Sequence, residues 1–284
     1  GVSGTLAGQP WLNDPATVRV MDALEAAGGA DCARFVGGCI RNSLVGRPVD
    51  DIDIATRLKP DQTMAALKAA GIKCVPTGLA HGTVTAVADR KPFEITTLRR
   101  DVETDGRHAV VAFTDDWGED ARRRDFRLNA LYADRSGLIF DPTAGGLEDA
   151  LAGRVVFVGD PHQRIEEDHL RILRFFRFFA WYGRSEPDPE SLKACAAHAD
   201  SLSRLSAERV SKELLKLLTA PEPRPSVAAM RVAGVLDRLL PAVPDLAVFE
   251  ALVDLTEDPV IRLSVLLPYD PDEVARTASA LRLP

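Results

Sequence analysis

The chain has 284 residues, of which 46% are hydrophobic and 27% are charged, so it has the composition of a globular protein that divides into two or three units. It holds no apolar run near the roughly 18 residues that a membrane span requires, so no membrane helix is expected. Its net charge of −7 argues against indiscriminate coating of nucleic acid, because that kind of binding is largely electrostatic.

The N-terminal residues lack the basic start and the apolar core of a signal peptide, and the four cysteines form no CxxC pair. We therefore expect a reducing, cytoplasmic compartment without a disulfide framework or structural zinc. The five histidines are also dispersed, so each is expected to be a surface or packing residue. Of the 35 basic residues 28 are arginines, which suit phosphates and base edges, although a high genomic GC content would also explain this excess.

The first half of the chain predicts a mixed α/β arrangement. Asp14 and Pro15 predict the N-cap and first turn of a helix that ends near Gly28, and a second helix is expected after Pro60. The polar stretch between Arg100 and Val110 predicts a mobile loop. The predicted strands are residues 34–36, 51–55, 83–88, 93–98 and 110–113.

From about Trp117 onward the apolar spacing becomes helical. Residues 117–134 predict one amphipathic helix, and residues 137–153 predict a strand, a turn and a short helix. After Pro161 nearly everything is predicted to be helical, and prolines beyond residue 220 predict a boundary there.

The most informative stretch, residues 37–56, reads GGCIRNSLVGRPVDDIDIAT. Asp51 and Asp53 share a face of the predicted strand, because side chains at i and i+2 point the same way, while Ile52 and Ile54 would enter the core. Mg²⁺ prefers carboxylate oxygens, so the pair predicts metal-dependent phosphoryl or nucleotidyl transfer. A DxD also occurs in metal-dependent glycosyltransferases and on solvated strands.

The glycines of the same stretch add a candidate anion site. Gly37 and Gly38 follow an apolar run and precede an amphipathic segment. Their bare backbone could bring amide N–H groups against a triphosphate.

A second motif is RRDFRLNAL, residues 123–131. On the predicted helix, Arg123 and Arg127 could hold a triphosphate while Asp125 accepts a hydrogen bond from a ribose hydroxyl. The alternative is a solvated basic helix.

A third motif is EEDHLRILRFFRF, residues 166–178. Asp168 and Arg171 are three residues apart and are expected on one helix face. Cytosine and adenine both present an amino donor beside a ring-nitrogen acceptor, so a carboxylate and a guanidinium could accept C and A and refuse G and U. An ordinary surface salt bridge is the alternative.

Together these motifs resemble those of the class II tRNA nucleotidyltransferases, the CCA-adding enzymes, and of the related bacterial poly(A) polymerases. The resemblance also covers TGLAHGTVTAV, FEITTLRRD, GGLEDALAGR as the hinge motif and ERVSKELLKLL as the last neck motif. It implies an α+β protein with a polymerase-β-like nucleotidyltransferase head built on a mixed sheet, then a helical neck and part of a helical body. The expected domains are residues 1–152, 153–219 and 220–284.

The resemblance also implies roles for individual residues. Asp51 and Asp53 would be the catalytic metal ligands, and Glu94 is a candidate third carboxylate, with a solvent-facing glutamate as the alternative. The residues implied in nucleotide binding are Gly37, Gly38, Arg41, Arg124, Asp125, Asn129, Asp168, Arg171 and Arg174.

Two departures from the family pattern are visible. Asn42 stands where the family usually has aspartate, and Arg127 stands where it usually has threonine. The chain also ends earlier than family members generally do, so we expect a truncated chain or a compact variant with weaker tRNA binding.

The expected reaction is the addition of CCA from CTP and ATP to the 3′ end of tRNA, with Mg²⁺ on Asp51 and Asp53, and with base choice by the neck. The segment near residues 101–108 would help the switch from C to A by moving. Poly(A) addition, a DxD glycosyltransferase and a non-catalytic RNA-binding protein remain alternatives. The oligomeric state is unknown.

Overall fold

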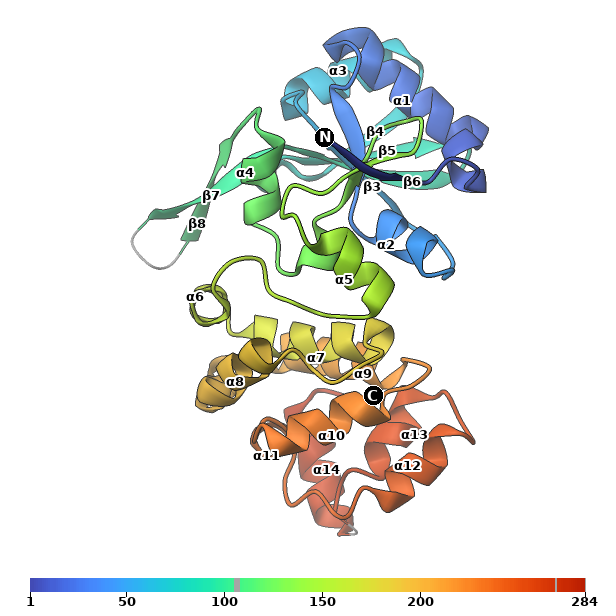
Figure 1. Cartoon of the computed structure of the whole chain (residues 1–284). Helices are drawn as coiled ribbons and strands as arrows, with labels where there is room; N and C mark the ends of the chain where they lie inside the picture. Colours follow the sequence, from blue (N-terminus) through green and yellow to red (C-terminus); the bar gives the residue numbers. More distant parts are fainter. Residues whose placement is uncertain (105–107, 269, 284) are drawn as a thin grey trace. The chain divides into compact units, whose positions relative to one another are not determined.

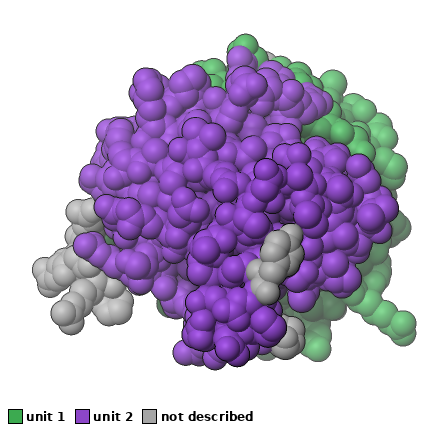
Figure 2. Space-filling model, turned by 90° about the horizontal axis from the view of Figure 1, so that it is seen from below, with its two compact units in different colours: residues 1–151 green, residues 152–284 purple. Residues whose placement is uncertain are grey.

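The computed structural model describes residues 1–104, 108–268 and 270–283. The chain divides into two compact units, residues 1–151 and 152–284, which are coloured separately in Figure 2 and described separately below. The described strands all lie in the first unit, and the described elements of the second unit are helices. This confirms the predicted α+β class. The three predicted domains stay a prediction.

The first unit is built on an eight-stranded mixed sheet and a separate two-stranded ribbon (Figure 1). The strands are β1 (Val2–Thr5), β2 (Ala33–Val36), β3 (Ile52–Thr56), β4 (Lys73–Gly78), β5 (Thr83–Ala88), β6 (Lys91–Thr97), β7 (Arg99–Thr104), β8 (His108–Phe113), β9 (Tyr132–Ala133) and β10 (Leu138–Phe140). The large sheet has the order β1-β10-β9-β2-β3-β6-β5-β4. Its central strand, β3, pairs antiparallel with β2 and parallel with β6.

Helices cover this sheet. Those of the first unit are α1 (Pro15–Gly28), α2 (Gly38–Leu44), α3 (Pro60–Ala69), α4 (Trp117–Arg122) and α5 (Gly146–Ala152), with short 3₁₀ turns η1 (Pro10–Asn13), η2 (Leu79–His81) and η3 (Arg127–Asn129). The predicted start of α1 is confirmed, because the Asp14 side chain accepts a hydrogen bond from the amide of Ala16. α1 and α3 lie side by side over the strands (Figure 1).

The prediction of one helix over residues 117–134 is wrong. α4 ends at Arg122, and the chain then passes through η3 into β9, which pairs with β2 and β10. The reason lies in the apolar run that follows. Leu128 and residues 130–133 are all buried, and a helix with a polar face cannot bury so many consecutive residues, whereas a strand inside a sheet can.

The predicted loop between Arg100 and Val110 is also wrong for the described residues. β7 and β8 form an antiparallel ribbon with Arg100 opposite Ala112. A two-stranded ribbon has few buried positions, so a polar sequence is compatible with strands. Residues 105–107 lie outside the described chain.

The second unit contains α6 (Pro161–Glu167), α7 (Leu170–Tyr182), α8 (Pro189–Ala197), η4 (Ala199–Arg204), α9 (Ala207–Leu218), α10 (Arg224–Val232), α11 (Leu236–Leu239), α12 (Ala247–Val253), α13 (Pro259–Ser264) and α14 (Pro271–Ala280). The apolar side of α7 forms its core, where Ile172, Phe175 and Phe176 are fully buried. α9 and α10 pack against α7.

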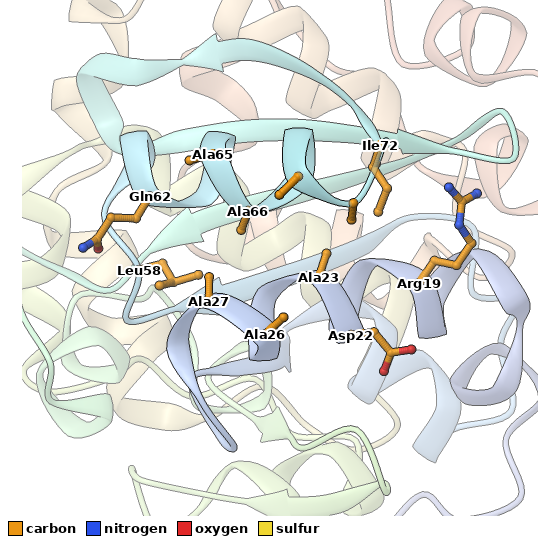
Figure 3. A pocket seen from close by; sticks show the side chains of 12 residues that line it. Arg19, Asp22, Ala23, Ala26, Ala27, Leu58, Gln62, Ala65, Ala66 and Ile72 are labelled. Carbon is orange, nitrogen blue, oxygen red and sulfur yellow. The ribbon is translucent and has the colours of Figure 1, made fainter.

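A pocket of about 760 Å³ opens between α1 and α3 (Figure 3). Its walls are mainly alanine side chains, including Ala23, Ala66 and Ala70. No residue predicted to bind metal or nucleotide lines it, so the candidate site lies elsewhere. Across the described ranges, no helix is both long and apolar enough to cross a bilayer.

Candidate active site

Asp53 lies at the middle of the sheet, on the central strand β3. In the strand register it stands opposite Val36 of β2 on one side and opposite Glu94 of β6 on the other. Asp51 comes directly before β3 and is exposed. Ile54 is buried as predicted, whereas Ile52 is only half-buried. The sheet therefore brings Glu94 beside the predicted catalytic pair.

The electrostatics of Asp53 reflect this crowding of carboxylates. Burial and the nearby charges of Glu94 and Asp51 raise the pKa of Asp53 to about 6, and the charge of Arg124 offsets them only in part. A bound cation would relieve that repulsion, so the donor set suits a divalent ion. Among the described residues, no group of three or more His, Cys, Asp or Glu side chains could hold a metal by itself. Any ion here would need water or substrate oxygens as further ligands.

Gly37 forms the turn that joins β2 to α2. Its φ of 77° and ψ of −123° suit glycine, because a side chain is strained there. The turn is fixed by a 3.0 Å hydrogen bond from the amide of Gly37 to the carbonyl of Leu131. Since Val36 is the register partner of Asp53, the predicted glycine turn lies next to the predicted acidic strand.

Three residues predicted to bind nucleotide are joined by hydrogen bonds. A guanidinium nitrogen of Arg41, on α2, donates to Oδ1 of Asn129. Nδ2 of Asn129 in turn donates to Oδ1 of Asp125 at 3.2 Å. Asp125 also accepts a 2.7 Å hydrogen bond from the amide of Phe126. Asn42, a departure from the family pattern, accepts from Arg41 and donates to the carbonyl of Pro48.

Arg124 is held by two groups that sequence reasoning missed. Its Nη2 donates to Asp120 at 3.0 Å and its Nε donates to the Tyr132 hydroxyl at 3.1 Å. Burial lowers the pKa of Arg124, but Tyr132 and Asp120 outweigh burial and raise it, so the residue is a fixed cation. The four-residue spacing of Asp120 and Arg124 in the sequence could have indicated this ion pair, because residues i and i+4 are neighbours on a helix.

Arg127, the other departure, has a clear structural role. Its Nε and Nη2 donate to the two carboxylate oxygens of Asp149, on α5, at 2.7 and 2.8 Å. Asp149 is fully buried. A Cβ on Gly146 would lie 2.3 Å from the carbonyl oxygen of Arg127, so this close approach requires glycine. Arg127 thus ties η3 to the predicted hinge motif, and its predicted contact with a triphosphate stays a prediction.

In the second unit, Asp168 and Arg171 do not lie on one helix face as predicted. α6 ends at Glu167, Asp168 has extended backbone angles, and α7 begins at Leu170. Asp168 binds Arg209 of α9 at 2.9 Å, and Arg171 binds Glu167 at 2.9 Å. The Asp168 carboxylate also accepts from the amide of Leu170 at the start of α7. Sequence reasoning missed Arg209.

Arginines line one side of α7. Arg171, Arg174 and Arg177 are all half-buried, at three-residue spacing. Arg177 is held by Glu213 of α9, in the predicted last neck motif. The half-buried arginines and the buried apolar residues thus occupy different sides of α7.

Three histidines predicted to be dispersed lie close together in this unit. Nδ1 of His162 is 3.1 Å from Nε2 of His198, and the rings of His169 and His198 are 6.3 Å apart. These three were expected to be isolated, but α6, the start of α7 and the end of α8 meet there. Within the described part of the chain, these histidines form no group of three that could hold a metal ion.

Comparison with protein families gives two matches. Residues 33–156 match the family described as "Poly A polymerase head domain", and residues 186–246 match "Probable RNA and SrmB- binding site of polymerase A". The first range contains the Gly37 turn, Asp51, Asp53 and Glu94. The second contains α9, with Arg209 and Glu213.

The chain is also similar to individual known proteins. The chain is 47% identical over 191 residues to CCA tRNA nucleotidyltransferase 1, mitochondrial, of Homo sapiens, covering 65% of this chain and 43% of that protein. It is 39% identical over 209 residues to the CCA-adding enzyme of Streptococcus pyogenes, covering 73% and 50%. The chain thus spans about half the length of these relatives.

A solved structure of a related enzyme is also similar to this chain. The CCA-adding enzyme of Bacillus stearothermophilus, in complex with CTP, matches with a TM-score of 0.71 and 33% identity, over 87% of this chain and 57% of that one.

Proposed function

Because the chain belongs to the family of class II tRNA nucleotidyltransferases and poly(A) polymerases, we propose that it is a CCA-adding enzyme. It transfers C and A residues from CTP and ATP to the 3′ end of tRNA. The observation that carries this proposal is the register of β3, which sets Asp53 beside both the Gly37 turn and Glu94.

Enzymes of this family use divalent metal ions. We propose Mg²⁺, held by Asp51 and Asp53 with Glu94 as a supporting carboxylate, because hard cations prefer carboxylate oxygens. Held by these carboxylates, such an ion would supply Lewis-acid polarisation for the RNA 3′-hydroxyl and the α-phosphate. The proximity of Glu94 and the raised pKa of Asp53 support this assignment.

The residues of the chain position the substrates. The amide of Gly37 is bound to the carbonyl of Leu131, so Gly37 shapes the turn while the amide of Gly38, at the start of α2, faces the triphosphate. Arg41 and Arg124 balance the negative charge of the triphosphate. Asp125 and Asn129 bind the ribose. The hydrogen-bonded chain of Arg41, Asn129 and Asp125 supports a shared role, because it holds the three side chains in one fixed arrangement.

The base is chosen in the neck, residues 153–219, which follows the head, residues 1–152. Asp168 accepts from the amino group of C or A and Arg171 donates to the ring nitrogen, with Arg174 beside them. Arg209 donates a 2.9 Å hydrogen bond to the Asp168 carboxylate and so helps to orient it. Residues 220–284 form part of the body.

The compartment remains a sequence-based proposal. We propose a cytoplasmic location from the sequence, although relatives named mitochondrial are among the matched proteins.

A tRNA transcript that lacks its 3′ CCA tests the proposal. It is incubated with the protein, Mg²⁺ and either CTP plus ATP or ATP alone, and the product 3′ ends are sequenced. We expect addition of C, C and A that then stops, and no long tail with ATP alone. A long A tail would identify a poly(A) polymerase, as the description of the head-domain family suggests. Binding without any incorporation would identify an RNA-binding protein.

A further inference from the structure

Asp120, on α4, is a fully buried carboxylate outside the set of residues discussed for catalysis. Four donors converge on its two oxygens. Oδ1 accepts from the amide of Arg99 at 3.0 Å and from Nε of Arg123 at 3.1 Å. Oδ2 accepts from Nη2 of Arg124 at 3.0 Å and from the hydroxyl of Tyr132 at 2.5 Å. A buried charge with this many partners is costly to remove and defines one local arrangement.

The first consequence concerns two neighbouring arginines. Arg123 and Arg124 are adjacent in the sequence, and burial together with the charge of Arg124 lowers the pKa of Arg123 to about 10. The single carboxylate of Asp120 binds both guanidinium groups. It therefore allows both to remain charged side by side.

The second consequence concerns the direction of Arg124. Its guanidinium donates two hydrogen bonds, from Nη2 to Asp120 and from Nε to the Tyr132 hydroxyl, and that hydroxyl in turn donates to Asp120. This closed triangle leaves little rotational freedom. The charge of Arg124 also acts on Asp53, whose pKa it lowers against the opposing carboxylates. Arg124 therefore binds Asp120 directly and also acts through its charge on Asp53.

The third consequence concerns the ribbon β7–β8. The amide of Arg99, the first residue of β7, donates to Asp120. The same carboxylate that fixes Arg124 thus also fixes the root of the ribbon. Both elements belong to the first unit.

We propose that Asp120 is a positioning residue for nucleotidyl transfer, which acts by aiming Arg124 at the incoming nucleotide and by tying the base of the β7–β8 ribbon to it. This assignment rests on the proposed function, because it assumes that Arg124 contacts the substrate. Asp120 itself, being fully buried, contacts no substrate.

Asp120→Asn tests the proposal, because it keeps the size of the side chain and removes its charge. Replacing a residue that holds a ligand-binding side chain in place typically lowers activity or affinity by about 10- to 100-fold. We expect a loss of that size in kcat/KM for CTP, in protein whose circular dichroism spectrum is that of the wild type. The matched control is Glu119→Gln, the adjacent, half-buried acid on α4, whose ion-pair contact with the exposed Arg100 is long, at 3.9 Å. It is expected to leave kcat/KM unchanged.

A double-mutant cycle separates positioning from a purely structural role. If Asp120 acts through Arg124, then Asp120→Asn added to Arg124→Ala causes little further loss, whereas independent effects multiply. Multiplied effects, or an unchanged kcat/KM in Asp120→Asn, would overturn the assignment. If Asp120→Asn does not fold, Tyr132→Phe replaces it in the same cycle, because Tyr132 completes the triangle. An inactive wild-type protein would instead refute the proposed function, and this assignment with it.

Discussion

Asp53 of β3 and Glu94 of β6 are direct neighbours across a parallel strand pair at the centre of the sheet. Their side chains start from matched positions on adjacent strands, so they share a face of the sheet. Two carboxylates in this relationship repel each other unless a proton or a cation lies between them. The pair is therefore the place in the first unit where the proposed divalent ion would relieve repulsion.

Replacing Glu94 tests this relationship. Glu94→Gln removes one carboxylate from the group, so we expect a higher Mg²⁺ concentration for half-maximal activity and a loss of about 10- to 100-fold at low Mg²⁺. The measurement is a Mg²⁺ titration of CMP incorporation. Glu190→Gln, a solvent-exposed acid on α8, serves as the control. An unchanged titration for Glu94→Gln would make Glu94 a solvent-facing residue.

Arg127→Thr restores the residue that the family usually has. It removes the partner of a fully buried carboxylate, Asp149, and breaking a buried ion pair in this way costs several kcal/mol. Since the Arg127 side chain is one-third exposed, we expect a smaller loss of about 2 kcal/mol in the free energy of unfolding.

Urea denaturation measures this loss. The double variant Arg127→Thr/Asp149→Asn is the control, because it also removes the buried charge and should recover part of the lost stability. An unchanged midpoint for Arg127→Thr would show that the pair contributes nothing to folding.

Base selection is tested with Asp168→Ala and Arg171→Ala. Each good bidentate pair contributes about 1–3 kcal/mol to discrimination, so we expect the kcat/KM ratio of CTP over UTP to fall on the order of tenfold. Arg209→Ala removes the partner of Asp168 without removing the base-reading carboxylate, and it should change the ratio less. If the ratio is the same in all variants, these side chains make only structural ion pairs.

The ionised state of Asp120 leads us to expect that the free energy of unfolding depends on pH in the acid range. Burial raises its pKa, but Arg124 and Arg123 outweigh burial and hold the pKa below its ordinary value of 3.8. A carboxyl group whose pKa is lower in the folded state than in the unfolded state stabilises the fold when it is ionised. This stabilisation is fully present above the pKa of the unfolded state, and it is lost as the pH falls through the pKa of the folded state. We therefore expect the free energy of unfolding to fall less steeply between about pH 5 and about pH 3 in Asp120→Asn than in wild type.

Urea unfolding at a series of pH values measures this slope. Glu190→Gln is again the control, because its exposed carboxylate should leave the slope unchanged. Equal slopes for Asp120→Asn and wild type would contradict the predicted ionisation of Asp120.

The sequence predicted the elements that carry strong local signals. The capped helix from Pro15 and the acidic strand β3 were found because capping and two-residue alternation depend on neighbours in the chain. The nucleotide set of Arg41, Asp125 and Asn129 was assigned from the resemblance, and the structure joins all three.

The failures have different physical causes. The β7–β8 ribbon is a local antiparallel pair, and it was missed because its first strand, Arg99–Thr104, has a mostly polar sequence. The end of residues 117–134 forms β9, whose pairing with the distant strand β2 no local pattern records. For the same reason Asp168 was paired with Arg171 on spacing alone, although its partner Arg209 is 41 residues away. Asp120 was missed because a buried carboxylate looks like any acidic residue until its donors are known.

The central claim is that Asp51 and Asp53 support transfer of nucleotides from CTP and ATP to an RNA 3′ end. The most direct test is incorporation of labelled CMP into a tRNA lacking CCA, by wild type and by the folded Asp51→Ala/Asp53→Ala variant, across a range of Mg²⁺ concentrations. Our account predicts Mg²⁺-dependent incorporation by wild type and none by the variant at any concentration. Incorporation by the variant at the wild-type rate would contradict it.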